Sequence, residues 1–473
     1  MHSTILRVKN NKIMAIENTS NESINSIIEA QRQFFRSEAT LDYDFRKKQL
    51  KLLQKALKRW QKPLCEALWS DLHKSAEEAI LTELSIVEGE IRNHLRHLKC
   101  WMKAERCSTP LKMAPSHSRI ISEPLGSALI IAPWNYPVQL LLNPLVGAIS
   151  AGCTAILKPS PYLPTVSKII EQMIEATFDE KYIAVVQGNR DVNIALLEHR
   201  FDIIFFTGSP ALGKTVMNAA AKHLTPVVLE LGGKSPCIVD KDADLKLAAR
   251  RIAWGKSLNA GQTCIAPDYL LIHKSLEQPF IEEFKAAIER LHGSNPKESR
   301  HYVRMVSDKA FERVKGYLSD GEVVAGGATD SAERYIEPTL LAGVSPTSSI
   351  MQEEIFGPLL PMITFERKEE VVKFITEREK PLALYYFGKE DDGWRMLRRT
   401  SSGGACLNDT IMHIANERLP FGGVGNSGMG SYHGRLSFDA FSHRRAVVVS
   451  PTWIDLPFRY MPYKLFSLVK KIL

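Results

Sequence analysis

A cysteine in a loop of small residues is the first feature of this sequence that could carry out chemistry. Cys264 lies in the segment Asn259-Ala-Gly-Gln-Thr-Cys264-Ile-Ala-Pro267. The small residues leave room for a substrate, and a cysteine thiolate is a strong nucleophile, particularly where its pKa is lowered. Taken alone, a single cysteine is more often a small buried hydrophobic residue. We interpret the other six in that way: Cys65, Cys100, Cys107, Cys153, Cys237 and Cys406.

A glutamate at the end of an apolar stretch is a candidate general base. Glu230 lies in Leu229-Glu230-Leu231-Gly232-Gly233-Lys234, 34 residues before Cys264. Partial burial where the chain turns would raise the pKa of its carboxyl group toward the range of a general base. The alternative is a structural carboxylate that forms a salt bridge with a lysine such as Lys234.

An asparagine between prolines is a candidate hydrogen-bond donor. Asn135 lies in Ala132-Pro-Trp-Asn135-Tyr-Pro137, directly after an apolar stretch. Its side-chain NH₂ group could stabilise a developing oxyanion. The alternative is an asparagine that only forms a turn.

Two predicted strand ends could bind parts of a nucleotide. Phe205-Phe206-Thr207-Gly208-Ser209, followed by Gly213, offers backbone N–H groups at the start of a helix, where a pyrophosphate could bind. It is not the Gly-x-Gly-x-x-Gly fingerprint. In Leu157-Lys158-Pro159-Ser160, a lysine at a strand end could bond to ribose hydroxyls. The alternative for the first segment is an ordinary Gly-Ser turn, and for the second a surface lysine at a turn. Two further loops, Glu353–Pro358 and Pro420–Gly428, have a structural turn as their alternative.

The elements that carry these segments alternate along the chain. Residues 21–105 have a helical pattern, which includes a helix predicted over Thr82–Lys103. Short apolar stretches then alternate with helical ones, which predicts a parallel α/β sheet, and a second series follows Glu230. The predicted strands are Ser127–Ala132, Thr154–Lys158, Tyr182–Gln187, Asp202–Phe206, Tyr269–Ile272, Leu359–Ile363 and Leu382–Tyr386, and helices are predicted over Thr165–Phe178 and Ala211–Ala221.

The composition limits the class of protein. A chain of 473 residues with 44% hydrophobic and 24% charged residues is too long for one ordinary core, so two or three globular domains are expected. A net charge of +8 over this length does not indicate nucleic-acid binding. Seven cysteines without metal-ligand spacing predict neither a disulfide framework nor a metal site. Without a signal peptide or a membrane-spanning stretch, a cytoplasmic protein is expected.

The last ten residues predict an amphipathic helix. Its apolar face would contain Leu465, Phe466, Leu468, Val469, Ile472 and Leu473. Lysines flank this face. Docking on the protein's own surface is the favoured interpretation. The alternatives are a helix that gates a substrate entrance and one that rests on a membrane surface.

Together and in this order, seven segments resemble those of the aldehyde dehydrogenase superfamily, across residues 22–450. Three further segments resemble its class 3 branch, which includes fatty-aldehyde dehydrogenases: Ile252–Lys256, Ser427–Gly434 and Phe441–Arg445. The resemblance implies an α/β fold with a Rossmann-type cofactor domain, an α/β catalytic domain and a β oligomerisation arm in a homodimer. It places the cofactor domain at residues 1–230, with an arm segment near 110–128, and the catalytic domain at 231–415. Residues 416–473 would return to the cofactor domain and the arm.

The resemblance also implies a reaction and a role for each candidate residue. The expected reaction is NAD- or NADP-dependent oxidation of a medium-chain, long-chain or aromatic aldehyde to a carboxylate, through a thiohemiacetal and a thioester on Cys264. Asn135 and the Cys264 N–H would form the oxyanion hole, and Glu230 would activate water. Thr207, Gly208, Ser209 and Gly213 would bind the pyrophosphate, Lys158 the adenosine ribose, Glu354 the nicotinamide ribose, and Phe356 would lie near the nicotinamide ring. By analogy, His413 and Asn416 would lie near the substrate entrance.

One departure bears on the choice of cofactor. Relatives often carry a carboxylate directly after the Lys-Pro-Ser turn, and Pro161 occupies that position here. Without a carboxylate to repel the 2′-phosphate, NADP is expected to be accepted. Two alternatives to the whole interpretation stay open: a cofactor-independent thiol esterase, and a non-catalytic binding protein on the same scaffold.

Overall fold

The apolar stretches of the first half form one parallel sheet. The structure is a computed structural model that describes residues 16–455, 459–463, 466 and 470. A six-stranded sheet has the order β17-β7-β6-β3-β4-β5, in which β17 (Gly428–Met429) is antiparallel to its neighbour and the other strands are parallel. The parallel strands are β3 (Ser127–Ile131), β4 (Thr154–Lys158), β5 (Ile183–Val185), β6 (Ile203–Thr207) and β7 (Val227–Glu230). The strands predicted in this half are confirmed.

Helices cover both faces of this sheet, as its fully buried strands require. Successive residues point to opposite faces: Phe205 belongs to one hydrophobic cluster and Phe206 to another. The Phe205 side is covered by α2 (Tyr43–Leu72), α4 (Ser85–Trp101), α5 (Gln139–Ala151) and α6 (Pro164–Glu175). The other side is covered by α1 (Asn21–Arg36), α7 (Arg190–Glu198) and α8 (Pro210–Ala221). The helix predicted over Thr82–Lys103 is observed as α4, preceded by α3 (Ala76–Ala79) and a π-helical turn at Ile80–Leu84.

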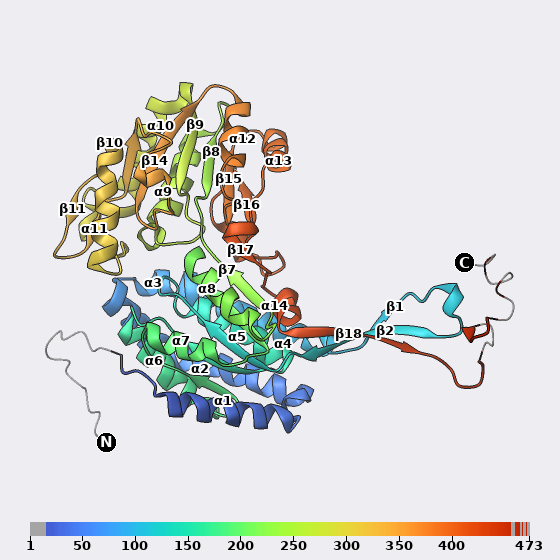
Figure 1. The fold of residues 1–473 in the computed structure, drawn as a ribbon. Coiled ribbons are helices and arrows are strands. Elements are labelled where there is room, and N and C mark those ends of the chain that lie inside the picture. The colour runs from blue at the N-terminus through green and yellow to red at the C-terminus, as the bar shows by residue number, and fades with distance from the viewer. Residues whose placement is uncertain (1–15, 456–458, 464–465, 467–469, 471–473) are drawn as a thin grey trace, which may run out of the picture.

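A second α/β unit follows β7 and lies above the first in Figure 1. Its seven-stranded sheet has the order β10-β13-β14-β9-β8-β15-β16, and β10 is antiparallel to β13. The strands are β8 (Pro236–Val239), β9 (Tyr269–His273), β10 (Glu322–Ala325), β13 (Thr339–Ala342), β14 (Leu359–Phe365), β15 (Ala383–Phe387) and β16 (Gly404–Leu407). The helices that pack on it are α9 (Leu245–Ser257), α10 (Glu277–His292), α11 (Asp308–Gly316), α12 (Lys368–Thr376) and α13 (Glu390–Arg399). The mixed α/β fold class predicted from the sequence is confirmed.

A three-stranded antiparallel arm projects from the first unit (Figure 1). Its order is β1-β2-β18, from β1 (Glu105–Cys107), β2 (His117–Pro124) and β18 (Ser442–Val449). Strand β18 follows α14 (Arg435–Ala440), which packs on α5. The chain therefore leaves the second unit and returns to the first before it ends.

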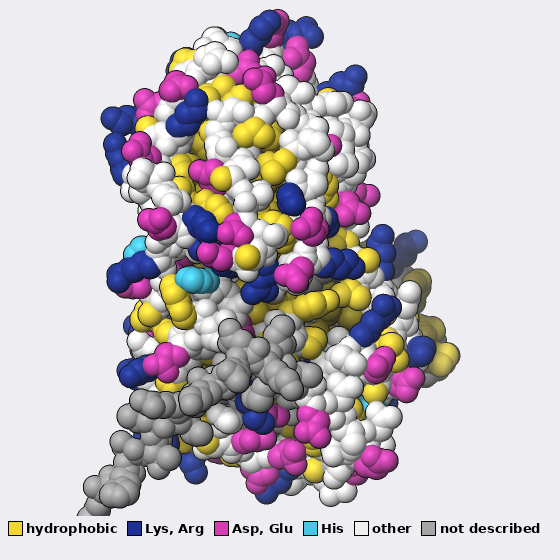
Figure 2. Space-filling view, turned by 90° about the vertical axis from the view of Figure 1, so that its left-hand side faces the viewer, with side chains coloured by type: hydrophobic (Ala, Val, Ile, Leu, Met, Phe, Trp, Pro, Cys, Tyr) yellow, Lys and Arg dark blue, Asp and Glu magenta, His cyan; other side chains and the backbone are white. Residues whose placement is uncertain are grey.

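Charges of both signs are interspersed on the face shown in Figure 2, so the positive net charge is not gathered into one basic patch on that face. Within the described residues, no helix is long and apolar enough to cross a membrane. Most of the predicted C-terminal amphipathic helix lies outside the described residues, which include only Phe466 and Lys470 of that segment.

Candidate active site

The carboxyl ends of the first sheet bring several predicted residues to one edge. Glu230 ends β7 and pairs in register with Thr207 at the end of β6. Lys158 ends β4 opposite Ile131 of β3, after which the chain continues to Asn135. Because parallel strands end at the same edge, residues far apart in sequence meet there, which is where open α/β sheets bind ligands.

A cavity of about 990 Å³ opens where this edge faces the second unit. Its lining includes eight of the ten predicted site residues: Asn135, Thr207, Gly208, Ser209, Glu230, Cys264, Glu354 and Phe356. Lys158 and Gly213 are not in the lining. Gly213 lies within α8, where an added Cβ would come within 2.8 Å of the Leu231 side chain. The close packing of α8 on Leu231 therefore depends on this glycine.

Glu230 is buried and contacts three side chains. Its Oε2 accepts hydrogen bonds from the Tyr432 hydroxyl at 2.8 Å and from Thr207 Oγ1 at 3.4 Å, and its Oε1 lies 3.4 Å from Cys264 Sγ. Burial raises the pKa of Glu230 to about 7, although these three hydrogen bonds oppose the shift. The direction of this pKa shift is the one predicted from the sequence. The alternative salt bridge with Lys234 is not formed, because Lys234 pairs with Asp268.

The Cys264 thiol is partly exposed to the cavity and donates its hydrogen to Glu230 Oε1. Burial and the nearby carboxylates of Glu230 and Glu354 raise the pKa of this thiol well above its ordinary value. The lowered pKa that would favour a free thiolate is not found. A raised pKa favours the protonated thiol, and the nearest carboxyl group to it is that of Glu230.

The loop before Cys264 has a strained backbone. Asn259, Ala260 and Gly261 adopt φ values of 51°, 52° and 70°, in the left-handed region. An added Cβ at Gly261 would lie 2.2 Å from the Gly357 carbonyl oxygen, so only glycine fits. The Gln262 side chain holds this loop, since its Nε2 donates to the carbonyls of Asn259 and Arg304, each at 3.1 Å. Such strain is typical of functional loops that the surrounding structure holds in place.

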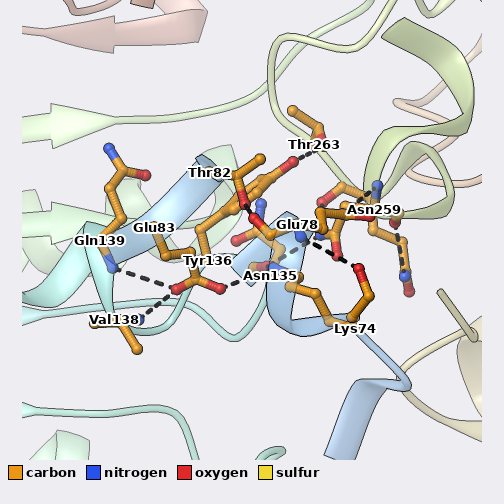
Figure 3. Close-up of polar contacts among 12 residues, drawn as sticks. Lys74, Glu78, Thr82, Glu83, Asn135, Tyr136, Val138, Gln139, Asn259 and Thr263 are labelled. Carbon is orange, nitrogen blue, oxygen red and sulfur yellow. Dashed lines mark hydrogen bonds and ion pairs between the residues drawn. The ribbon is translucent and has the colours of Figure 1, made fainter. Parts of the chain in front are cut away.

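Asn135 is 2% exposed and lines the cavity together with Cys264. Its backbone carbonyl accepts hydrogen bonds from Lys74 Nζ and from Asn259 Nδ2, each at 3.0 Å (Figure 3). Within the part of the chain that the structure describes, no hydrogen bond is made by its side-chain amide. The amide is therefore available to a group in the cavity.

Comparison with known proteins identifies the family to which this site belongs. The sequence model of the aldehyde dehydrogenase family matches residues 2–447. The chain belongs to the aldehyde dehydrogenase family. The 4,4'-diaponeurosporen-aldehyde dehydrogenase of Staphylococcus aureus is 46% identical to this aldehyde dehydrogenase over 436 residues, which cover 92% of this chain and 95% of that protein. Human aldehyde dehydrogenase family 3 member B1 is 47% identical over 419 residues, 88% of this chain and 90% of that protein.

A solved structure agrees with this assignment. The substrate-bound state of Staphylococcus aureus AldH matches this aldehyde dehydrogenase with a TM-score of 0.93 and 44% identity, over 95% of this chain and 99% of that one. The similarity to family 3 members confirms the class 3 branch predicted from the sequence. The protein is an oxidoreductase that acts on aldehydes and uses NAD or NADP.

The residues around the cavity fit a dinucleotide. Ser209 caps the N-terminus of α8, and Gly208 and Ser209 both line the cavity where this helix begins. An added Cβ at Gly208 would lie 2.6 Å from the Phe206 ring, so this position needs a glycine. Lys158 is buried, and among the described residues its ammonium, which has three donors, bonds only to the Pro159 carbonyl. Burial lowers the pKa of Lys158 to about 8.

Glu354 and Phe356 line the cavity from the second unit. Glu354 lies over Gly232, where an added Cβ would come within 1.9 Å of its Oε2, and burial raises the pKa of Glu354 to about 8. Phe356 adopts a φ of 47° and packs edge-on against Trp134, with ring centroids 5.3 Å apart. A non-glycine residue in this conformation marks a loop held in place by its surroundings.

His413 and Asn416 do not line the cavity, and three residues that bond to its lining or to the segment that contains Asn135 were not predicted from the sequence: Lys74, Glu83 and Tyr432. His413 stacks on Phe421 and its Nδ1 lies 3.4 Å from Cys406 Sγ, while Asn416 is exposed. Their location near the substrate entrance stays a prediction. Tyr432 lies inside a quoted class 3 segment, but nothing in its spacing indicated a contact with Glu230. Lys74 and Glu83 lie in the helical region, and no local pattern there indicated that they are buried.

Proposed function

We propose that this enzyme oxidises a medium-chain, long-chain or aromatic aldehyde to a carboxylate through a thiohemiacetal and a thioester on Cys264. The observation that carries the proposal is the 3.4 Å contact between Cys264 Sγ and Glu230 Oε1. It supports a pairing of Cys264 as nucleophile with Glu230, whose pKa is about 7, as base, in a cavity that Asn135 also lines. A base with a pKa near the working pH is the most effective one.

The proposed reaction begins with proton transfer from the Cys264 thiol to Glu230. The sulfur then attacks the carbonyl carbon, and the Asn135 amide and the Cys264 N–H donate hydrogen bonds to the oxyanion of the thiohemiacetal. NAD or NADP, when bound, supplies an acceptor for the hydride that leaves this carbon. Glu230 next releases the thiol proton to solvent and then removes a proton from water, which attacks the thioester. Release of the carboxylate returns the sulfur, and the proton on Glu230 restores the thiol.

We propose that Glu354 and Phe356 hold the nicotinamide half of the cofactor, and Lys158 the adenosine ribose. Thr207, Gly208, Ser209 and Gly213 would lie along the pyrophosphate, with Gly213 acting through the packing of α8 on Leu231. Pro161, in place of a carboxylate, supports acceptance of NADP. Activity with NADP below about a hundredth of that with NAD, a loss of roughly 2.7 kcal/mol, would contradict this part.

The substrate class is supported by the relatives and by the residues before Cys264. The Staphylococcus aureus relative is named for the aldehyde of 4,4'-diaponeurosporen. In this chain Trp254 and Leu258 are partly buried hydrophobic side chains on the segment that leads to Cys264. An apolar aldehyde would gain free energy by leaving water beside such residues.

The organisation of the chain is also proposed. Residues 1–230 and 416–473 would form the cofactor domain with the arm, and residues 231–415 the catalytic domain. Strand β18 pairs only with β2 among the described strands, so its other edge presents unpaired backbone groups along eight residues. Such an edge can pair with another chain, which supports a homodimer formed through the arm.

The test is formation of NADH or NADPH, followed by absorbance, with a panel of aldehydes from short aliphatic to long-chain and aromatic. Wild type, Cys264→Ala and the control Cys406→Ala would be compared. We expect turnover by wild type and Cys406→Ala, none by Cys264→Ala, and higher kcat/KM for longer or aromatic aldehydes. Ester hydrolysis without any cofactor-dependent aldehyde turnover would favour the thiol esterase instead. The buried ammonium of Lys158 and the carboxylate of Glu354 argue against it, since an esterase has no use for them.

A further inference from the structure

Two charged side chains are completely buried behind the Asn135 segment. Lys74 and Glu83 are each 0% exposed, and Lys74 Nζ lies 2.8 Å from Glu83 Oε1. They come from either side of α3 in the helical layer of the first unit. Removing two charges from water is costly and is repaid only by good geometry and further hydrogen bonds. Here the further hydrogen bonds of both side chains are made to residues 135–139, the segment that contains Asn135.

The pair holds the segment that follows β3. Lys74 Nζ donates to the Asn135 carbonyl at 3.0 Å and lies 4.3 Å from the centroid of the Tyr136 ring. Glu83 Oε2 accepts from the backbone N–H groups of Val138 at 2.8 Å and Gln139 at 3.3 Å. One ion pair therefore fixes both the start and the end of residues 135–139 (Figure 3).

The same segment is bonded to the loop that precedes the nucleophile. Asn259 Nδ2 donates to the Asn135 carbonyl and to the Gln262 carbonyl, each at 3.0 Å. The Tyr136 hydroxyl lies 2.7 Å from Thr263 Oγ1. Thr263 directly precedes Cys264, so these bonds join the two units at the position of the nucleophile.

Asn259 is also fixed from the helical layer. Its backbone N–H donates to Glu78 Oε1 at 3.0 Å, and Glu78 lies between Lys74 and Glu83 in the sequence. This bond helps to keep Asn259 at a φ of 51°, a conformation that asparagine adopts more readily than most residues. The helical layer thus contacts the Asn135 segment and the Cys264 loop at once.

We propose that Lys74, Glu83 and Asn259 are positioning residues that set the side-chain amide of Asn135 against the Cys264 thiol. The Asn135 carbonyl accepts two donors, one of them charged, so its peptide plane cannot rotate without breaking both bonds. That leaves the side-chain amide aimed at the cavity. This inference rests on the proposed roles of Asn135 and Cys264, and it adds the residues on which their mutual placement depends.

The experiment compares two reactions of Cys264 that differ in one respect. Acylation by p-nitrophenyl acetate passes through a tetrahedral oxyanion, whereas alkylation by iodoacetamide does not. Loss of the placement of Asn135 should therefore slow acylation and leave alkylation nearly unchanged. Misplacement of a catalytic group by about 1 Å can lower a rate by about a hundredfold. We expect Lys74→Met and Asn259→Asp to lower the acylation rate constant by about tenfold to about a hundredfold, and the alkylation rate constant by less than about threefold.

A double-mutant cycle with Asn135→Ala shows whether the effect acts through Asn135. If it does, Lys74→Met should slow acylation in the wild-type background and have little further effect in the Asn135→Ala background. If Asn135→Ala itself leaves acylation unchanged, the proposed oxyanion role is wrong. If Asn135→Ala slows acylation but Lys74→Met does not, or the two effects are additive, the positioning role is wrong and the oxyanion role stands.

Two further variants test whether a loss of acylation comes from misfolding or from the removal of any ion pair. Lys74→Met leaves a buried carboxylate without its partner, which can prevent folding. Lys74→Met/Glu83→Gln removes both charges while keeping an acceptor for the Val138 N–H, and it should show the same selective loss of acylation. The exposed pair Lys274–Glu366, with side chains 66% exposed and 2.9 Å apart, supplies the matched control. Lys274→Met/Glu366→Gln should leave both rate constants as in wild type, and a selective loss of acylation there would overturn the inference.

Discussion

Tyr432 and Glu230 are 202 residues apart in the sequence, and the tyrosine hydroxyl donates a 2.8 Å hydrogen bond to Glu230 Oε2. The contact depends on β17, where Gly428 pairs in register with Glu230 at the edge of the first sheet. The returning chain then places Tyr432 beside the carboxylate. The environment of the proposed base is therefore completed by a part of the chain that follows the second unit.

Tyr432→Phe should raise the pKa of Glu230 further, because the lost hydrogen bond favours the charged carboxylate. A hydrogen bond to a charged group contributes roughly 1.5–3 kcal/mol, which corresponds to about one to two pH units. The acid side of the pH profile of kcat should move to higher pH by about that amount, with activity recovering above it. Tyr302→Phe is the control, since that buried hydroxyl bonds to the remote Ile336 carbonyl. An unmoved acid limb in Tyr432→Phe would show that this bond does not tune the base.

Glu230→Gln should change how stability depends on pH. The pKa of Glu230 is raised by burial to about 7 in the folded protein, from 4.5. Folding therefore favours the neutral acid, and this stabilisation is fully present below pH 4.5 and is lost as the pH rises through 7. The variant should gain about 3 kcal/mol in free energy of unfolding relative to wild type across that interval. Denaturant titrations would measure it, with the exposed Glu366→Gln as control, and a gap that does not vary with pH contradicts a raised pKa.

Gly261→Ala should disable the enzyme and destabilise the fold. The new Cβ would lie 2.2 Å from the Gly357 carbonyl oxygen, at a φ of 70°. The loop must move, and a displacement of about 1 Å beside Cys264 should lower kcat by about a hundredfold. Gly343→Ala is the matched control, because Gly343 has a φ of 64° with nothing within 4 Å of its added Cβ. It should cost about 1–3 kcal/mol of stability and leave kcat unchanged. Equal kcat values in the two variants would refute the steric argument.

Pro161→Glu should favour NAD over NADP. A carboxylate after the Lys158 turn would repel a 2′-phosphate, and two like charges at about 4 Å repel by about 1 kcal/mol or more even in water. We expect kcat/KM for NADP to fall by about tenfold relative to that for NAD. Pro161→Gln separates charge from loss of the proline ring and should not alter the ratio. A ratio unaffected by the glutamate would mean that this turn does not face the ribose.

Lys158→Met should weaken cofactor binding and remove a pH dependence. Burial lowers the pKa of Lys158 to about 8, so its ammonium loses its proton as the pH rises through 8. Wild-type affinity for the cofactor should therefore decline above that pH, while the variant should bind about tenfold more weakly at neutral pH and without that decline. Titration of cofactor binding on either side of pH 8 would measure both effects, with the exposed Lys274→Met as control. A variant that keeps the wild-type decline would exclude Lys158 as its source.

Much of the fold could be predicted because strands buried on both faces read as short apolar stretches. The stretch Thr154–Lys158 is observed with the predicted bounds, and Asp202–Phe206 shifts by one residue. Glu230 and Lys158 could be chosen as candidate site residues because each is a charged residue at the end of such an apolar strand. A charged side chain at that position does not contribute to the apolar core, so a role in binding or catalysis is a reasonable prediction. Placement at a strand end also predicts that they share one edge of a sheet.

The positioning residues could not be predicted in this way. Lys74 and Glu83 belong to a helical region rich in lysine and glutamate, and their burial follows only from the packing of that region against the Asn135 segment. The left-handed run at Asn259–Gly261 was equally hidden, since only Gly261 carries a local signal for it. Tyr432 could not be predicted as a partner of Glu230 for a related reason. Their contact depends on the pairing of β17 with β7, and the residue pattern of neither strand predicts that pairing.

The return of the chain to its first sheet has a consequence for biosynthesis. Strand β17 forms the edge of that sheet and β18 completes the arm, yet both follow the whole second unit. On a ribosome, where domains generally fold as they emerge, the first unit must wait for some 200 residues of the second with its edge strand β7 unpaired on one side. The exposed edge of β7 carries Glu230, so until β17 is made the strand that bears the proposed base is open to pairing with other chains.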